Sequence, residues 1–327
     1  MGYGVTGKIL HVDLTRRTTT IETFDESFYR LYPGGKALAA YYVLKNVPPH
    51  ADPLSPDNVL VLANGLLTGA PVSTATRYTA AARSPLTGAY GESEAGGFWG
   101  PELKFAGFEA IVVHGQASSP VYLWVKDGQA EIRDAQHLWG HEPEETQETI
   151  RQELGDKLIR VLQIGIGSEN LVRYGAITNE MRHYNGRNGM GAVMGSKKLK
   201  AIAVRGKIKY LDLAHDPQAL AKLGQLLPKR VKEHPQSWDL QNRGTPGLVD
   251  GLNAAGILPT RNFHQGAFEG VDKVAWEVYE KELLTARRSC YACAVRCKRE
   301  TETHDRYDVS GSYGGAEYET IGGFGQN

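Results

Sequence analysis

The chain has 327 residues, 41% of them hydrophobic and 23% charged, which is ordinary for one or two globular domains with a buried core. Lysine plus arginine and aspartate plus glutamate both number 37, and this balance argues against a general nucleic-acid binder. The sequence lacks an apolar run of about eighteen residues and a secretion signal, so we expect no membrane span.

The first two hundred residues predict a strand-rich fold with some helices. Alternating apolar and polar residues predict paired strands at 8–14 and 18–24, and an apolar run predicts a strand at 58–63. Residues 120–134 predict a hairpin that turns at Asp127–Gly128. Helices are predicted at 26–46, with an interruption at 33–35, and at 143–155, where proline begins and glycine ends the segment. Three further strands are predicted at 159–165, 174–179 and 199–206.

Strands and helices do not alternate regularly, which disfavours a doubly wound parallel sheet. The character changes after about residue 207, and the segments 217–234 and 272–288 have helical periodicity. We therefore predict an α+β protein with a strand-rich domain at 1–207 and the beginning of a mainly helical domain at 208–327.

All three cysteines lie in the segment "SCYACAVRCKRE". Cys290, Cys293 and Cys297 have C-x2-C-x3-C spacing, which is typical of a metal site and not of a disulfide framework, so we expect a reducing cytoplasm. An iron–sulfur cluster is favoured over zinc because no second cysteine or histidine pair lies nearby. Arg296, Lys298 and Arg299 would offset the cluster's negative charge. All three are basic and lie within two residues of Cys297, the third cysteine.

Three other segments could carry chemistry. The glycine-rich segment at 184–202, with Arg187 and several lysines, suits a phosphate group, although a tight turn without a ligand explains it equally well. Arg77 and Arg83 lie among small residues and could bind a phosphate or a cofactor ring, or lie on the surface. Glu317 and Glu319, in "GGAEYETIGG", are candidates for acid–base work or simply solvated charges.

In combination, these segments resemble the aldehyde ferredoxin oxidoreductase family. The resemblance runs along nearly the whole chain, in the family's order: "DPLSPDNVLVLANGLLTG", "TRYTAAARSPLTG", "GGFWGPELKFAGFEAIVV", "EIRDAQHLWG", "IGIGSENLV", "GAVMGSKKLKAIAV", "CYACAVRC" and "EYET". It implies a first domain with two β-sheets forming a saddle-like or barrel-like base for two pterins, followed by mainly helical domains.

The resemblance also implies the chemistry. Tungsten, or molybdenum as an alternative, would be bound by two pterins whose phosphates are bridged by Mg²⁺, with a [4Fe–4S] cluster nearby. The reaction would oxidise a small aldehyde to a carboxylate and pass electrons to ferredoxin or an iron–sulfur subunit. Two alternatives remain: a catalytic subunit of a related complex such as a benzoyl-CoA reductase, or a non-catalytic pterin-binding module. Homo- and hetero-oligomers both remain open.

The family's site residues map onto single positions here. Arg77 matches the arginine between a pterin and the cluster, and Cys290, Cys293 and Cys297 match three cluster ligands. Glu319 matches the glutamate that is proposed to transfer protons near tungsten. The remaining positions match the two pterin-side loops: Glu94, Ala95 and Gly96, then His183, Tyr184, Asn185, Gly186 and Arg187.

This chain departs from the family in two ways. The family usually has asparagine at position 94 and arginine at position 183, where this chain has glutamate and histidine. Family members are about twice as long, and we expect the fourth cluster cysteine beyond Asn327, with the chain stopping within an element.

Overall fold

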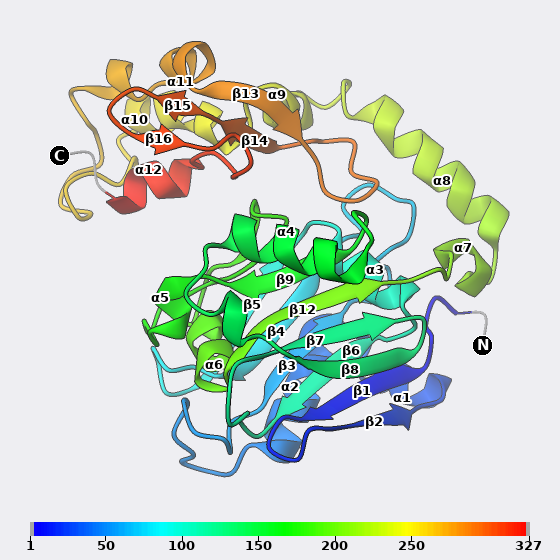
Figure 1. Ribbon diagram of the computed structural model, residues 1–327. Helices are drawn as coiled ribbons and strands as arrows, with labels where there is room; N and C mark the ends of the chain where they lie inside the picture. The colour runs from blue at the N-terminus through cyan, green and yellow to red at the C-terminus, as the bar shows by residue number, and fades with distance from the viewer. Residues whose placement is uncertain (1–2, 325–327) are drawn as a thin grey trace. The chain divides into compact units, whose positions relative to one another are not determined.

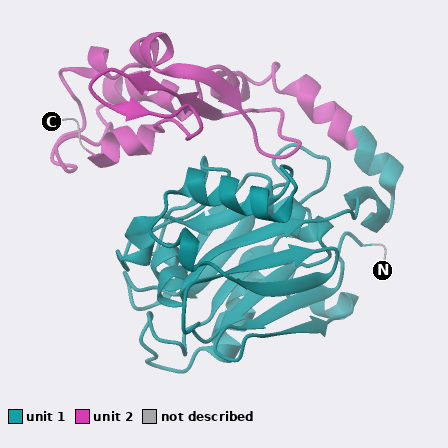
Figure 2. Cartoon of the chain, in the orientation of Figure 1, with its two compact units in different colours: residues 1–222 teal, residues 223–327 magenta. Residues whose placement is uncertain are grey.

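The computed structural model describes residues 3–324, and the expectation about how the chain ends falls outside these residues. The chain forms two compact units, residues 1–222 and 223–327 (Figure 2). We call them unit 1 and unit 2 and describe each by itself. The predicted domain boundary at 207/208 lies in the connection after the last strand of unit 1, whereas the units divide inside helix α8, Pro217–Arg230.

Unit 1 contains two six-stranded sheets, and Figure 1 labels most of their strands. The first has the order β2-β1-β6-β3-β4-β5, and only β1 and β6 pair in parallel. The second has the order β11-β10-β9-β12-β7-β8, and only β12 and β7 pair in parallel. Both sheets are therefore mixed and mostly antiparallel, and together with the helices they confirm the predicted α+β class. The strands are β1 Lys8–Asp13, β2 Thr18–Thr23, β3 Leu60–Asn64, β4 Tyr78–Arg83, β5 Tyr90–Ala95, β6 Ala110–His114, β7 Val121–Lys126, β8 Gln129–Asp134, β9 Arg160–Ile164, β10 Ile177–Asn179, β11 His183–Asn185 and β12 Leu199–Arg205.

Period-2 alternation decides how the sheets pack. Alternate apolar side chains from both sheets meet in one shared core, which includes Leu62 and Ile111 from the first sheet and Leu123 and Ile202 from the second. Helices α3, Trp99–Phe105, and α6, Met190–Ser196, contribute further side chains to this core. The strand residues that alternate with these core residues point to the outer faces of the two sheets.

Each outer sheet face is covered by a helix. On the first sheet, Val61 and Val112 pack with Leu38 and Tyr42 of α2, Gly35–Asn46, which follows the short α1, Glu26–Leu31. On the second, apolar strand residues pack against Ile150 of α4, Pro143–Leu154. The other short helical segments of unit 1 are η1 Gln136–Leu138, α5 Ile166–Glu169 and α7 Tyr210–Leu213.

Unit 2 is mainly helical, with two short hairpins. Its helical segments after α8 are α9 Pro235–Arg243, η2 Thr245–Leu248, α10 Val249–Ala254, η3 Val271–Lys273, α11 Trp276–Glu282 and α12 Tyr318–Phe324. Its strands are β13 Leu284–Arg288, β14 Lys298–Thr301, β15 Thr303–His304 and β16 Asp308–Val309. None of the helices within residues 3–324 combines the length and apolar character that a membrane crossing requires.

Most local predictions are confirmed. The hairpin turns at Asp127–Gly128, where both residues have positive φ, and α4 ends at Gly155 in the left-handed conformation. The interruption at 33–35 separates α1 from α2. The single helix predicted at 272–288 is wrong: α11 ends at Glu282, and residues 284–288 pair with β14 as a strand.

Candidate functional site

Polar side chains join the two sheets of unit 1 where edge strand β5 meets edge strand β11 and the loop after it. Asn185 donates from Nδ2 to the Ser93 carbonyl at 2.7 Å, and Asn188 donates to the Glu92 carbonyl at 2.7 Å. The Arg187 amide donates to Ser93 Oγ at 3.2 Å. We call these residues, with Tyr78 and Asn179, the amide seam. It satisfies backbone groups that an edge strand would otherwise leave exposed.

Tyr78 lies at the centre of the amide seam and is buried. Its hydroxyl donates to Asn185 Oδ1 at 2.8 Å and accepts from Asn179 Nδ2 at 3.0 Å. Asn179 Nδ2 also donates to the Gly96 carbonyl at 3.2 Å. Burial raises the pKa of Tyr78, which keeps the phenol protonated and able to donate. One tyrosine therefore connects β4, β10 and β11.

The turn after β5 approaches the β10–β11 turn closely. Gly97 has φ of 102°, and a Cβ at this position would overlap Asn179 Oδ1 and lie 2.8 Å from Glu180 Oε2. Glu180 Oε2 accepts the Phe98 amide at 3.0 Å. Burial raises the pKa of Glu180 to about 7, against the opposing effect of the nearby Arg160, Arg151 and Arg182. Only glycine fits this crossing of two chain segments.

The amide seam brings both predicted pterin-side segments together. Ala95, Gly96, His183 and Asn185 are buried in it, whereas Tyr184, Gly186 and Arg187 are exposed beside them. Arg77 is also exposed and comes directly before Tyr78, which pairs with Ala95. Arg77 and Arg187 are exposed, and Gly186 leaves its backbone accessible, so these residues are suited to bind an anionic group.

Glu94 lies on the exposed side of β5. Lys36 of α2 contacts both Glu92, at 2.8 Å, and Glu94, at 3.6 Å, and this pairing raises the pKa of Lys36. The Glu94 carboxylate therefore has the Lys36 side chain of helix α2 as a neighbouring cation.

The lysines after the glycine-rich turn have structural roles, contrary to the phosphate-binding interpretation. Lys197 is buried and donates to the carbonyls of Asn58 and Gly115. Lys200 is buried and pairs with Glu169. Close packing explains a neighbouring glycine, because a Cβ at Gly191 would overlap the Ala176 carbonyl. The exposed residues of this segment are Tyr184, Gly186 and Arg187.

Arg83 has a partly structural setting. Its amide donates to Asn58 Oδ1 at 3.0 Å, and its side chain is half-buried at the end of β4. Arg77, in contrast, is exposed, so Arg77 is the better placed of these two arginines to meet a ligand.

The cysteines of unit 2 lie in the loop between β13 and β14. These two strands pair antiparallel, and Arg288 lies opposite Lys298 at the ends next to the loop. The Cys293 amide donates to the Cys290 carbonyl at 3.2 Å, which forms a turn. Burial raises the pKa of the Cys297 thiol, and the neighbouring Lys298 acts in the opposite direction. Within residues 3–324, however, no three ligating side chains already have metal-binding geometry, so cluster ligation stays a prediction.

The two glutamates near the end of unit 2 differ in their surroundings. Glu317 contacts Lys298 Nζ at 2.5 Å and also accepts from Thr245. Glu319 is exposed on α12. Its predicted catalytic role stays a prediction.

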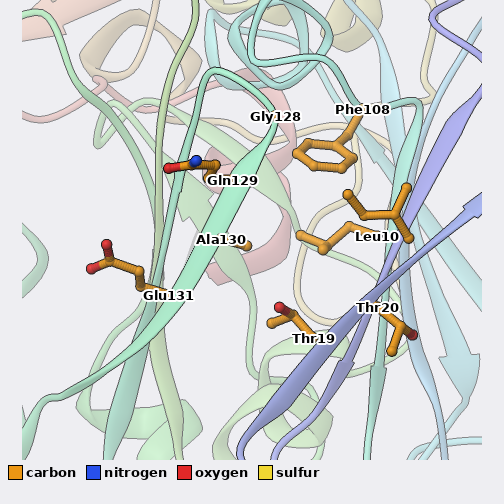
Figure 3. A pocket seen from close by; sticks show the side chains of 9 residues that line it. Leu10, Thr19, Thr20, Phe108, Gly128, Gln129, Ala130 and Glu131 are labelled. Carbon is orange, nitrogen blue, oxygen red and sulfur yellow. The ribbon is translucent and has the colours of Figure 1, made fainter.

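A cavity of about 510 Å³ lies on a different part of unit 1, where Leu10 and Phe108 face Gly128 and Ala130 (Figure 3). Its lining includes residues of β2 and β8, the edge strands at the opposite ends of the two sheets from β5 and β11. None of the predicted site residues lines it. This cavity is therefore separate from the amide seam.

Sequence reasoning missed Tyr78, Asn179, Glu180 and Asn188. The available signal was the polar run "TNEMRHYNGRN", in which asparagines recur within and beside short strands. Asparagine is disfavoured in strands unless its amide has a specific partner.

The two units match neighbouring parts of one oxidoreductase class. Residues 9–206 match "Aldehyde ferredoxin oxidoreductase, N-terminal domain", and residues 222–327 match "Aldehyde ferredoxin oxidoreductase, domains 2 & 3". The chain therefore belongs to the aldehyde ferredoxin oxidoreductase family.

Individual relatives agree with this assignment. The tungsten-containing aldehyde ferredoxin oxidoreductase of Pyrococcus furiosus is 39% identical over 325 residues, covering 99% of this chain and 53% of the relative. An aliphatic sulfonate oxidoreductase, WOR-like subunit, of the same organism is 34% identical over 219 residues, covering 62% and 35%. The chain spans about half the length of the first of these relatives.

A solved structure is also similar. The active site complex BamBC of benzoyl coenzyme A reductase, in complex with 1,5 dienoyl-CoA, superposes with a TM-score of 0.79 and 32% identity. The match covers 93% of this chain and 48% of that chain.

Proposed function

We propose that this chain forms the pterin-binding base and part of the cluster-binding region of a tungsten aldehyde ferredoxin oxidoreductase. The observation that carries the proposal is the amide seam, which gathers Arg77, the Glu94–Gly96 segment and the His183–Arg187 segment in a chain of this family. When bound, the tungsten–pterin group supplies the two-electron chemistry that converts an aldehyde and water to a carboxylate.

The chain's own residues fit such a group. Asn179 Oδ1 and Glu180 Oε1 are buried oxygens that lack a hydrogen-bond partner among the described residues, and both belong to residues beside the Gly97 turn. Arg77 and Arg187 would pair with phosphates, and Mg²⁺ would lie at the same loop. Cys290, Cys293 and Cys297 would supply three ligands of a [4Fe–4S] cluster that passes electrons to ferredoxin, and Glu319 would move a proton.

Metal analysis tests this proposal directly. The intact protein, purified without oxygen from cells supplied with tungsten, should contain tungsten, pterin and iron, and it should reduce a viologen dye when given an aldehyde. The absence of both tungsten and iron would overturn the proposal. Molybdenum in place of tungsten would retain the fold and the pterin site but correct the metal.

The similarity to the benzoyl-CoA reductase complex supports a second candidate, an aromatic acyl-CoA reductase subunit. The two candidates differ in substrate and not in the residues described above. Dye reduction with an aldehyde but not with 1,5-dienoyl-CoA favours the first, and the reverse favours the second. Bound pterin without turnover of either substrate would favour the third interpretation, a non-catalytic pterin-binding module.

A further inference from the structure

Glu180 is a buried carboxylate for which the proposed chemistry has no role so far. Only 5% of the residue is exposed, and its Oε1 lacks a hydrogen-bond partner among residues 3–324. Glu180 and Met181 both have positive φ, at 48° and 56°, which is uncommon for residues other than glycine. A buried, strained, half-satisfied carboxylate costs stability, and such features gather at functional sites.

The carboxylate contacts one segment in particular. Its Oε2 accepts the Phe98 amide at 3.0 Å, directly after Gly97, whose missing side chain makes room for it. The neighbouring Asn179 donates to the Gly96 carbonyl at 3.2 Å. The β10–β11 turn thus fixes three consecutive residues that follow β5.

The surroundings of Glu180 explain how a charge is tolerated there. Arg160 of β9 lies over the Phe98 ring, with 4.6 Å from Cζ to the ring centroid. Arg160, Arg151 of α4 and Arg182 of the same turn all favour the ionised form of Glu180. His183 also borders Gly97. Cations from three elements therefore face this carboxylate.

We propose that Glu180 is a positioning residue that holds the Gly96–Phe98 turn in the shape that the pterin side of the cofactor requires. This inference rests on the proposed function. Glu180 acts through the Phe98 amide and the Gly97 crossing, and it need not touch the reacting atoms.

Glu180→Ala and Glu180→Gln in the intact protein test this role, with exposed Glu142→Gln at the start of α4 as the control. Amide hydrogen exchange over residues 96–99 and pterin and tungsten content per folded chain are the two measurements. Alanine removes the acceptor, so protection should fall about tenfold at this turn alone, with several-fold less cofactor. Glutamine keeps an acceptor oxygen and should retain most of both.

Several outcomes would overturn the proposal. The first is that the amides of residues 96–99 stay as protected in Glu180→Ala as in the wild type. The second is that this variant loses protection at the turn but keeps its full cofactor content. The third is that it loses protection across all of unit 1. Failure of the glutamine variant to rescue the turn would also overturn it. A wild-type protein without pterin would contradict the proposed function instead, and the exchange measurement would still show whether Glu180 fixes the turn.

Discussion

At the level of single residues, neutral amides hold the candidate site together. Asn179, Asn185 and Asn188 each donate to a backbone carbonyl of the chain segment 92–96. A hydrogen bond from a neutral side-chain amide tolerates burial better than an ion pair does, because no full charge has to leave water. The arginines are therefore left exposed beside the amide seam, where they can meet an anion.

Gly97→Ala should destabilise unit 1 more than Gly88→Ala does. Both glycines have positive φ, 102° and 73°, but a Cβ at Gly88 meets no atom within 4 Å. We expect a loss of about 1 kcal/mol at position 88 from backbone strain, and about 1–3 kcal/mol more at position 97 from overlap. Urea unfolding measures both. Equal losses of unfolding free energy would mean that the β10–β11 turn shifts at little cost to make room for a Cβ at position 97.

Glu180→Gln should change how stability depends on pH. The pKa of Glu180 rises from 4.5 to about 7 on folding, so the folded state keeps a proton that the unfolded chain releases. Its stabilising contribution is present below about pH 4.5 and is lost as the pH rises to about 7. At pH 8 the variant should therefore gain up to about 3 kcal/mol over the wild type, relative to their difference at pH 4.5.

Denaturant unfolding at several pH values measures this difference, with Glu142→Gln as the control. A constant difference between Glu180→Gln and the wild type would contradict the assigned burial of the carboxylate. A gain in stability at pH 8 together with retained pterin binding is the expected result for this variant, because glutamine keeps the oxygen that accepts the Phe98 amide.

At the level of elements, apolar alternation places each strand between two packed layers. Leu62 and Ile202 face the shared core, whereas Val61 and Ala203 face the outer helices. The strand at 284–288 was missed because its partner β14 lies beyond the cysteine loop. Local periodicity carries no information about such a partner.

Hydrogen exchange should rank the strands by their place in the sheets. Strands β9 and β12, like β3 and β4, are paired on both sides and buried on both faces, so their amides should be among the slowest to exchange. The edge strands β2 and β8 should exchange at least about tenfold faster. Exchange measured by mass spectrometry tests this ranking. Equal protection in β2 and β12 would contradict the sheet order.

At the level of the whole molecule, the two units divide the proposed chemistry. The segments proposed to meet the pterins lie in unit 1, and the cysteines and Glu319 lie in unit 2. Among residues 3–324, the apolar clusters described above are built from residues of unit 1, mainly those of its strands and helices. Iron binding and the fold of unit 1 should therefore be separable.

The double variant Cys290→Ser with Cys293→Ser should lose iron by at least about tenfold, because thiolates are the ligands of such clusters. Hydrogen exchange in unit 1 should stay unchanged. Ser289→Ala, beside the cysteine loop, is the matched control. Full iron content in the double variant would contradict the cluster assignment, and zinc in the wild type would support the alternative metal.

The sequence by itself determined the elements that depend on neighbours along the chain. The Asp127–Gly128 hairpin and the α4 helix follow from turn and capping chemistry within a few residues. It also determined the family, because the motifs recur in order over nearly the whole chain. The cysteine spacing predicted the kind of metal site, which remains to be measured.

Only the tertiary structure decided which polar residues share a site. Tyr78 and Asn185 are 107 positions apart, and Glu180 meets Phe98 from 82 positions away. It also decided that Lys197 and Lys200 serve the core and not a phosphate. The physical reason is the same in each case: a buried polar group must find a partner, and the packing of the two sheets decides which one is within reach.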